Sequence, residues 1–260
     1  MDIGKAFTFI FEDPDWLKKV AIGSGLLLLG IIFSVVLIGL IPLIIITGYT
    51  VLLVKNVMDG AERPLPEWED WGDLFMRGLK LFLIVLIWAI PLIFVSLFSS
   101  LPLALVEEGS NVRAIGELEE FVATLLPLAL VEEGSNVRVI MVVISICCGC
   151  LTAILSIAYA LLEPVLTFRF ARTNDFASGF EFGKIFRLLG DNIVNIIIAV
   201  IVAGVAGVIL LILGTFVGTI ALVIGLLVTI PATAFLSTLV EAHLIGQEGR
   251  EAEAKAVVSD

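Results

Sequence analysis

The chain alternates between long apolar blocks without a charged residue and short segments that hold its charges. Residues 20–54 and 192–240 carry no charge, and one straight helix over either block would far exceed the roughly 20 residues that cross a bilayer. Each block therefore predicts two crossings. Gly39 and Pro42 are expected to break the first block, and residues 214–218, which begin and end with glycine, are expected to form the turn in the second.

Six membrane-spanning helices follow from this pattern. They are residues 20–38, 43–57, 81–100, 139–162, 192–213 and 219–240. The second is short, with Lys55 near its end able to reach the headgroups, and Pro91 is expected to kink the third. We predict an all-α, polytopic transmembrane helical bundle of three hairpins. It forms a single integral membrane domain over residues 1–245, followed by a polar cytoplasmic tail at 246–260.

The basic residues of the connecting segments gather on one side of this bundle. They precede the first span and lie between the second and third spans and between the fourth and fifth: Lys5, Lys18, Lys19, Lys55, Arg63, Arg77, Lys80, Arg169, Arg172, Lys184 and Arg187. The other side has only Arg113 and Arg138. Because Lys and Arg accumulate on the cytoplasmic side of membrane proteins, both termini are predicted to be cytoplasmic.

A weak repeat precedes each hairpin. A Gly-x-x-Phe pattern begins at Gly4, Gly72 and Gly183, and around it apolar residues recur at near-helical spacing beside charges. Such segments suit the membrane surface, with tryptophans at headgroup depth. We therefore predict a cytoplasmic interfacial amphipathic helix before each hairpin.

A second repeat is identical in both copies. The thirteen residues LPLALVEEGSNVR at 101–113 recur at 126–138. We interpret them as a tandem duplication that lengthened an outer loop, residues 101–138. The duplication is either a repeated binding epitope or, as we favour, an insertion tolerated at an exposed loop.

Composition supports a membrane protein and leaves partners open. Of the 260 residues 60% are hydrophobic and 16% charged, and the mean hydropathy is +1.14. The net charge of -11 arises in connecting segments and the C-terminal residues, where solvation explains it. No basic patch points to nucleic acid.

The cysteines indicate neither a disulfide framework nor a redox centre. Cys147, Cys148 and Cys150 lie together in an apolar stretch, where small residues favour close helix packing. A Cys-x-x-Cys pair could in principle bind metal, but no histidine or second pair lies nearby. We predict no cofactor.

Three ionisable residues lie at the edges of the predicted spans, whose middles carry no charge. They are Glu163, Glu241 and His243. Charged groups within a membrane usually mark ion paths or proton relays, but at a span edge they can also be solvated, which we favour here. Glu241 and His243 alone cannot complete a metal site.

The densest polar feature between spans is the cytoplasmic segment at residues 60–73. Its candidate functional residues are Arg63, Pro64, Pro66, Trp68, Trp71 and Asp73. The carboxylates of Glu67, Glu69, Asp70 and Asp73 could hold a hard cation such as Mg²⁺. Acidic residues in the first turn of a helix explain them equally well, and we predict no metal.

Three stretches carry a family resemblance: MDIGKAFTFIFEDPDWLKK at 1–19, ERPLPEWEDWGDLF at 62–75 and AHLIGQ at 242–247. They resemble the DUF4013 family of bacterial and archaeal multi-pass membrane proteins, which has no assigned activity. The resemblance implies a helical membrane fold in the cell membrane of a bacterium or archaeon. The duplicated loop departs from the family's pattern.

No catalytic constellation is visible, so we do not expect an enzyme. The leading hypothesis is a non-enzymatic membrane scaffold or accessory subunit that contacts the lipid bilayer and a protein partner or a second copy of the chain. The alternative is a transporter or channel for a small solute, with a cavity between the hairpins.

Overall fold

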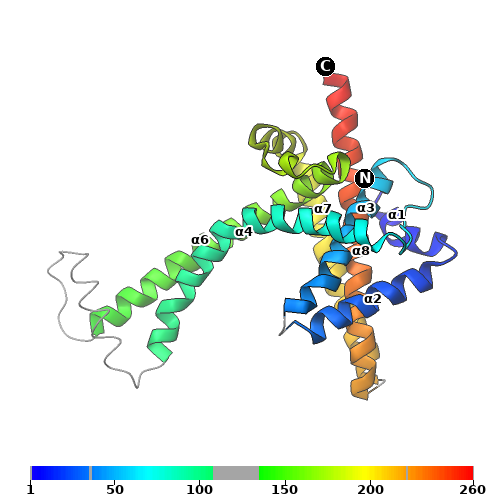
Figure 1. The fold of residues 1–260 in the computed structure, drawn as a ribbon. Coiled ribbons are helices and arrows are strands. Elements are labelled where there is room, and N and C mark those ends of the chain that lie inside the picture. Colours follow the sequence, from blue (N-terminus) through cyan, green and yellow to red (C-terminus); the bar gives the residue numbers. More distant parts are fainter. Residues whose placement is uncertain (1, 35–36, 108–134, 221, 260) are drawn as a thin grey trace. The chain divides into compact units, whose positions relative to one another are not determined.

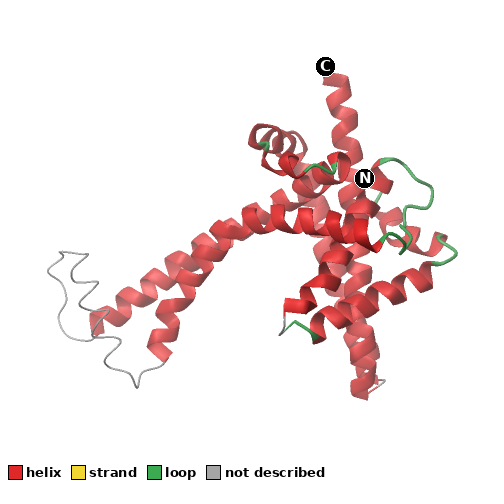
Figure 2. Ribbon diagram, in the orientation of Figure 1, coloured by secondary structure: helices red, strands yellow, loops and turns green. Residues whose placement is uncertain are grey.

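In the computed structural model, described for residues 2–34, 37–107, 135–220 and 222–259, every regular element is helical (Figures 1 and 2). The α-helices are α1 (Ile3–Thr8), α2 (Trp16–Ile32), α3 (Leu40–Met58), α4 (Trp71–Glu107), α6 (Ser135–Thr173), α7 (Phe182–Ile220) and α8 (Leu222–Ser259). Short 3-10 turns are η1 (Phe9–Glu12), η2 (Leu37–Gly39) and η3 (Phe176–Phe180). The all-α prediction is confirmed.

Five helical segments within the described residues are long and apolar enough to cross a membrane. They are Leu37–Met58, Trp71–Leu97, Val143–Thr173, Phe182–Ile220 and Gly225–Lys255. The remaining predicted span corresponds to α2, which has 17 residues and is slightly shorter than the roughly 20 that a crossing needs. The protein is therefore a helical membrane protein, and the count of six crossings stays a prediction.

The chain divides into two compact units. The first comprises Met1–Leu86 and Ala160–Asp260, and the second comprises Ile87–Tyr159. In the first unit α8 packs against α7, α3, α2 and α1. Tyr49 and Leu53 of α3 and Phe235 and Leu239 of α8 are fully buried there. Helix α8 is thus the central element of the first unit.

The predicted turn at residues 214–218 is wrong. Helix α7 continues to Ile220, and α8 begins at Leu222. Gly214 and Gly218 instead form the close contact between these helices: a Cβ at Gly214 would lie 2.6 Å from the Thr233 side chain, and one at Gly218 would lie 2.3 Å from Thr229 Oγ1. Glycine here provides a helix-packing surface rather than a turn.

The break between the first two predicted spans lies earlier than expected. Helix α2 ends at Ile32, and α3 starts at Leu40, directly after Gly39. Pro42 lies in the first turn of α3, where a missing N–H removes no intrahelical hydrogen bond.

Only the first of the three predicted interfacial helices is a separate helix. Helix α1 and η1 precede α2, whereas α4 begins at Trp71 and α7 at Phe182, and both run on into apolar sequence without a break. Continuing a formed helix adds one hydrogen bond per residue and avoids a new nucleation, which explains why charged residues ahead of an apolar block join its helix.

Other predicted boundaries lie inside helices. Residues 101–107 of the predicted outer loop belong to α4 and residues 135–138 to α6, while residues 108–134, which hold most of the duplication, lie outside the described residues. The predicted polar tail is helical as far as Ser259, the last residue of α8.

Candidate functional site

The proline-containing segment between α3 and α4 is fixed by hydrogen bonds to its backbone. The carbonyl oxygens of Pro64, Leu65 and Pro66 accept from Asn56 Nδ2 at 2.9 Å, Lys19 Nζ at 3.1 Å and Tyr49 OH at 3.0 Å, respectively. Proline restricts φ, which favours an extended backbone. Three consecutive carbonyls of this segment are therefore satisfied by side chains of α2 and α3.

A buried ammonium lies beside this segment. Lys19 Nζ lies 2.7 Å from Asp13 Oδ2 and 2.6 Å from Glu67 Oε1, and the Lys19 side chain is 3% exposed. Burial alone would lower the pKa of Lys19, but the hydrogen bonds and charges of Asp13 and Glu67 outweigh it and raise the pKa. The ammonium is thus held charged between the buried carboxylate of Asp13 and the exposed carboxylate of Glu67.

Aromatic stacking completes the junction. Trp68 donates its indole N–H to the Lys19 carbonyl at 3.0 Å and stacks on Tyr49 with ring centroids 4.1 Å apart. Trp71 in turn stacks on Trp68, with ring centroids 5.7 Å apart. Phe235 of α8 lies 6.2 Å from Trp68. Trp68 therefore joins α2, α3 and α8, whereas Trp71 is exposed at the edge of this aromatic group.

The remaining candidate functional residues of this segment do not come together at one site. Arg63 is exposed, and Asp73 pairs with Arg77 one turn further along α4 at 2.5 Å. Glu67 is paired with Lys19, so the carboxylates considered as cation ligands face different partners. Within the described residues no three His, Cys, Asp or Glu side chains are arranged to hold a metal ion. The geometry of this segment therefore indicates a structural role, as the junction between α2, α3 and α8.

Glu163 and Glu241, by contrast, come together in one pocket of about 210 Å³ in the first unit. Glu163 lies on α6 and is half-buried, and Glu241 lies on α8 and is exposed. Both lie within candidate membrane spans. The polar lining consists of these two carboxylates and Thr47, Thr50, Thr167 and Thr238.

The threonines of this pocket mainly offer acceptors. Thr47, Thr50 and Thr238 donate their hydroxyl protons to backbone carbonyls of their own helices at 3.0, 2.8 and 3.0 Å. Thr167 is 7% exposed and makes no hydrogen bond to a described residue. None of the described lining residues is Lys, Arg or His. The pocket is therefore acidic and rich in oxygen lone pairs.

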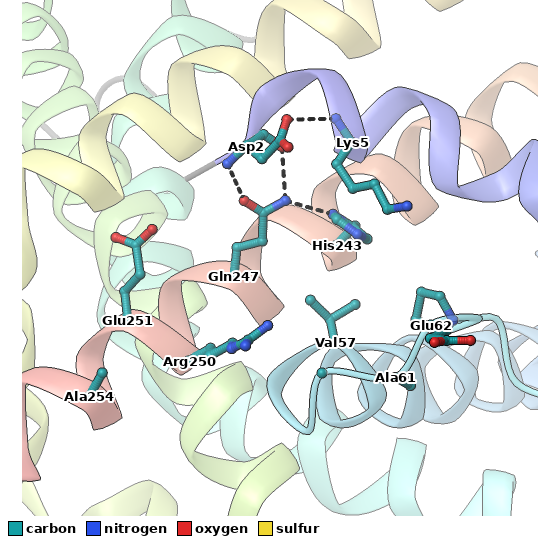
Figure 3. Close-up of a pocket in the computed structure, with 12 residues that line it drawn as sticks. Asp2, Lys5, Val57, Ala61, Glu62, His243, Gln247, Arg250, Glu251 and Ala254 are labelled. Carbon is teal, nitrogen blue, oxygen red and sulfur yellow. Dashed lines mark hydrogen bonds between the residues drawn. The ribbon is translucent and has the colours of Figure 1, made fainter.

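His243 lies apart from this pair and lines a second pocket of about 500 Å³ (Figure 3). It lies two positions after Glu241, a rotation of about 200° around the helix, which turns the side chains to different faces. Its ring is 4% exposed and stacks on Phe9 with centroids 4.3 Å apart. The single histidine is thus packed against the N-terminal segment.

Gln247 joins His243 to the N-terminus, as Figure 3 shows. Its Oε1 accepts from the Asp2 backbone N–H at 2.5 Å, and its Nε2 donates to the Asp2 carbonyl at 2.9 Å. This pair fixes the orientation of the amide, so Nε2 also donates to His243 Nδ1 at 3.0 Å. The neutral ring then carries its proton on Nε2.

The four threonines are not among the site residues predicted from the sequence, although their spacing held a signal. Thr167 follows Glu163 by one turn of α6, and Thr238 precedes Glu241 by three residues on α8. Residues three or four apart share a helix face, so each glutamate has a threonine neighbour on its own helix. A polar face on an otherwise apolar span is the sequence pattern that indicates such a pocket.

These features define a helical membrane protein with an acidic pocket between its helices. The chain belongs to the family described as "Protein of unknown function (DUF4013)", whose model matches residues 28–219. The match includes the 62–75 segment and Glu163, whereas the resembling stretches at 1–19 and 242–247 lie outside it. No curated protein and no solved structure matches the chain.

Proposed function

We propose that this protein is a non-enzymatic transporter or channel for a small solute, which binds between its helices. The observation that carries the proposal is the pocket where Glu163 and Glu241 meet. Ionisable side chains in membrane helices are costly, and they commonly mark substrate or ion paths. The sequence alone favoured a scaffold or accessory subunit, because it showed no catalytic constellation and no charge in the middle of a predicted span.

The size of the pocket suits this role. About 210 Å³ is smaller than the 300–1,000 Å³ typical of drug-sized ligands, so the solute would have only a few heavy atoms. Residues from α3, α4, α6 and α8 line the pocket. A site shared by several helices can open to either side through small movements of one helix against another.

We further propose that the protein lies in the cell membrane of a bacterium or archaeon with both termini in the cytoplasm. Contacts at one end of the first unit support this orientation. Asp2 is hydrogen-bonded to Gln247 of α8, and Arg172 at the end of α6 contacts Asp59 after α3 and Glu253 of α8. The basic segments assigned to the cytoplasm thus share contacts with the C-terminal part of α8.

Reconstitution in proteoliposomes tests the proposed function. Uptake of a panel of neutral, cationic and anionic small solutes is measured for the wild-type protein and for Glu163→Gln and Glu241→Gln. Glu69→Gln, an exposed change between α3 and α4, is the matched control. We expect uptake of at least one solute that both pocket variants reduce by about tenfold or more and the control leaves unchanged. A wild-type protein that moves no solute of the panel would contradict the proposal.

The second compact unit is compatible with a second function, that of an accessory subunit. Its described residues present large apolar side chains at the surface, including Ile90, Phe94, Ile154 and Ile157. Lipid or the helices of a partner would cover such side chains equally well. Purification in native nanodiscs with mass spectrometry separates the two cases, because only a subunit retains a stoichiometric partner.

A further inference from the structure

We infer that the Glu163–Glu241 pocket binds a small organic cation that carries an ammonium group. This inference rests on the proposed function and adds the substrate class. It concerns the charge and hydrogen-bonding character of the solute, which the existence of a pocket alone does not determine.

Charge is the first argument. Glu163 and Glu241 both line the pocket, and neither forms an ion pair with a described residue. A cationic side chain is also missing from the described lining. Unpaired carboxylates in an apolar setting are unfavourable, so a bound cation would stabilise the pocket where an anion would be repelled.

Hydrogen bonding is the second argument. The hydroxyl protons of Thr47, Thr50 and Thr238 are already donated to helix carbonyls, which leaves their oxygen lone pairs free to accept. Thr167 lines the same pocket, is more than nine-tenths buried and has no hydrogen-bond partner among the described residues. An ammonium group brings only donors and therefore matches a lining that consists almost entirely of acceptors.

The apolar part of the lining distinguishes an organic cation from a bare metal ion. Leu81, Phe82 and Val85 of α4 line the pocket together with the acidic residues. A volume of about 210 Å³ also leaves room beyond a single ion, since one water needs only about 10–15 Å³ on this scale. The arrangement fits an ammonium group beside the carboxylates with a short alkyl group against α4.

Binding to the purified, full-length protein in nanodiscs tests the inference without requiring a variant. The probes are n-propylammonium, its neutral counterpart n-propanol, and tetramethylammonium, which has charge but no N–H donor. We expect isothermal titration to show propylammonium binding at least about tenfold tighter than either of the others. Equal affinity for propylammonium and propanol would overturn the inference, as would binding of Mg²⁺ in place of the amine.

Variants then locate the site. Glu163→Gln and Glu241→Gln, checked for folding by their unfolding temperatures, should each weaken propylammonium binding about tenfold or more, and Thr167→Val about threefold. Glu69→Gln should leave binding unchanged. Undiminished binding in both glutamate variants would overturn the inference.

The two proposals fail in different ways. If only neutral solutes enter proteoliposomes, and they do so through the glutamate pocket, the transport proposal stands and the cation inference is wrong. If amines bind but no solute crosses the membrane, the inference of a cation-binding pocket stands and the proposal of transport is wrong.

Discussion

The ammonium of Lys19 and the carboxylate of Asp13 depend on one another because both are buried. Lys19→Met keeps the apolar stem but leaves the Asp13 carboxylate buried without its counterion. Breaking a buried pair in this way costs about 3–5 kcal/mol. We expect a clearly lower unfolding temperature in detergent or nanodiscs, measured by intrinsic tryptophan fluorescence.

The neighbouring lysine provides the control for this change. Lys18 is exposed, so Lys18→Met should change the free energy of unfolding by about 0.5 kcal/mol or less. Equal effects of the two substitutions would show that the buried ion pair does not stabilise the junction.

Asp59 gives a prediction for the pH dependence of stability. Its hydrogen bond from Lys55, reinforced by one from Arg172, lowers its pKa in the folded protein. A carboxyl whose folded pKa is depressed stabilises the protein above its unfolded pKa, and this contribution is lost as the pH falls through the folded value. Asp59→Asn should therefore lower stability slightly at pH 7, by about 1 kcal/mol or less for so exposed a pair.

The difference from wild type should shrink below about pH 4, where the wild-type carboxyl also becomes protonated. Thermal unfolding of both proteins between pH 3 and 8 checks this. A difference that stays constant across the range would assign the effect of Asp59→Asn to something other than charge.

The residues of the candidate site could be found from sequence only in part. Glu163 and Glu241 stand out in the sequence as ionisable residues at the edges of apolar spans. Their proximity is not evident there, because they lie on α6 and α8 and meet only through tertiary packing. Trp68 and Trp71 were expected at headgroup depth. The stacking of Trp68 on Tyr49, and of Trp71 on Trp68, depends on how the segment folds back over α3, which local sequence does not encode.

At the scale of helices, α3 and α4 cross so closely that glycine is required on both. A Cβ at Gly48 would lie 1.8 Å from the Leu74 carbonyl oxygen, and one at Gly78 would lie 1.8 Å from that of Ile44. Gly48→Ala must push the two backbones apart, and overpacking of this kind costs about 1–3 kcal/mol. We expect a lower unfolding temperature and a lower yield of folded protein.

Gly25→Ala in α2 is the matched control for this crossing. A Cβ at Gly25 meets nothing within 4 Å, so the substitution should be neutral or should stabilise the helix by about 0.5–1 kcal/mol. If Gly48→Ala proved as harmless as Gly25→Ala, the close crossing of α3 and α4 would be wrong.

Gln247 of α8 is hydrogen-bonded to Asp2, the N-cap residue of α1, and its substitution should weaken the attachment of α1 to α8. Gln247→Leu loses both hydrogen bonds to the Asp2 backbone and the one to His243. At about 1 kcal/mol for each bond, α1 should open far more often. Hydrogen exchange followed by mass spectrometry should show faster exchange in the peptide that contains α1, while Arg250→Gln, an exposed change on the same helix, leaves the exchange unchanged.

Hydropathy located the apolar blocks but not the ends of the helices. The blocks end where charges begin, yet α8 continues through Glu241 to Ser259 and α4 starts before its block, at Trp71. Hydropathy reports which residues tolerate lipid, whereas a helix ends only where its backbone hydrogen bonds are interrupted. The same distinction explains why Gly214 and Gly218, read as a turn, lie inside α7 and pack on α8.

At the scale of the whole molecule, topology links the sequence to the proposed function. In the first unit Arg172, at the end of α6, donates to Asp59, which follows α3, and to Glu253 near the end of α8. These three segments therefore lie together. If every hairpin returns to the side where it began, these segments all lie in the cytoplasm. That arrangement requires an even number of crossings, and α2 must then cross despite its 17 residues.

Cysteine labelling in intact cells tests this topology. In a background with Cys147, Cys148 and Cys150 replaced by alanine, single cysteines are introduced by Ser34→Cys, Thr219→Cys, Glu62→Cys and Ala177→Cys, all at exposed positions. An impermeant maleimide should label the first two from outside and the last two only after lysis. Labelling of Glu62→Cys in intact cells would mean that α2 and α3 do not form a complete hairpin. The basic segments would then lie on both sides, and the cytoplasmic assignment of the termini would be wrong.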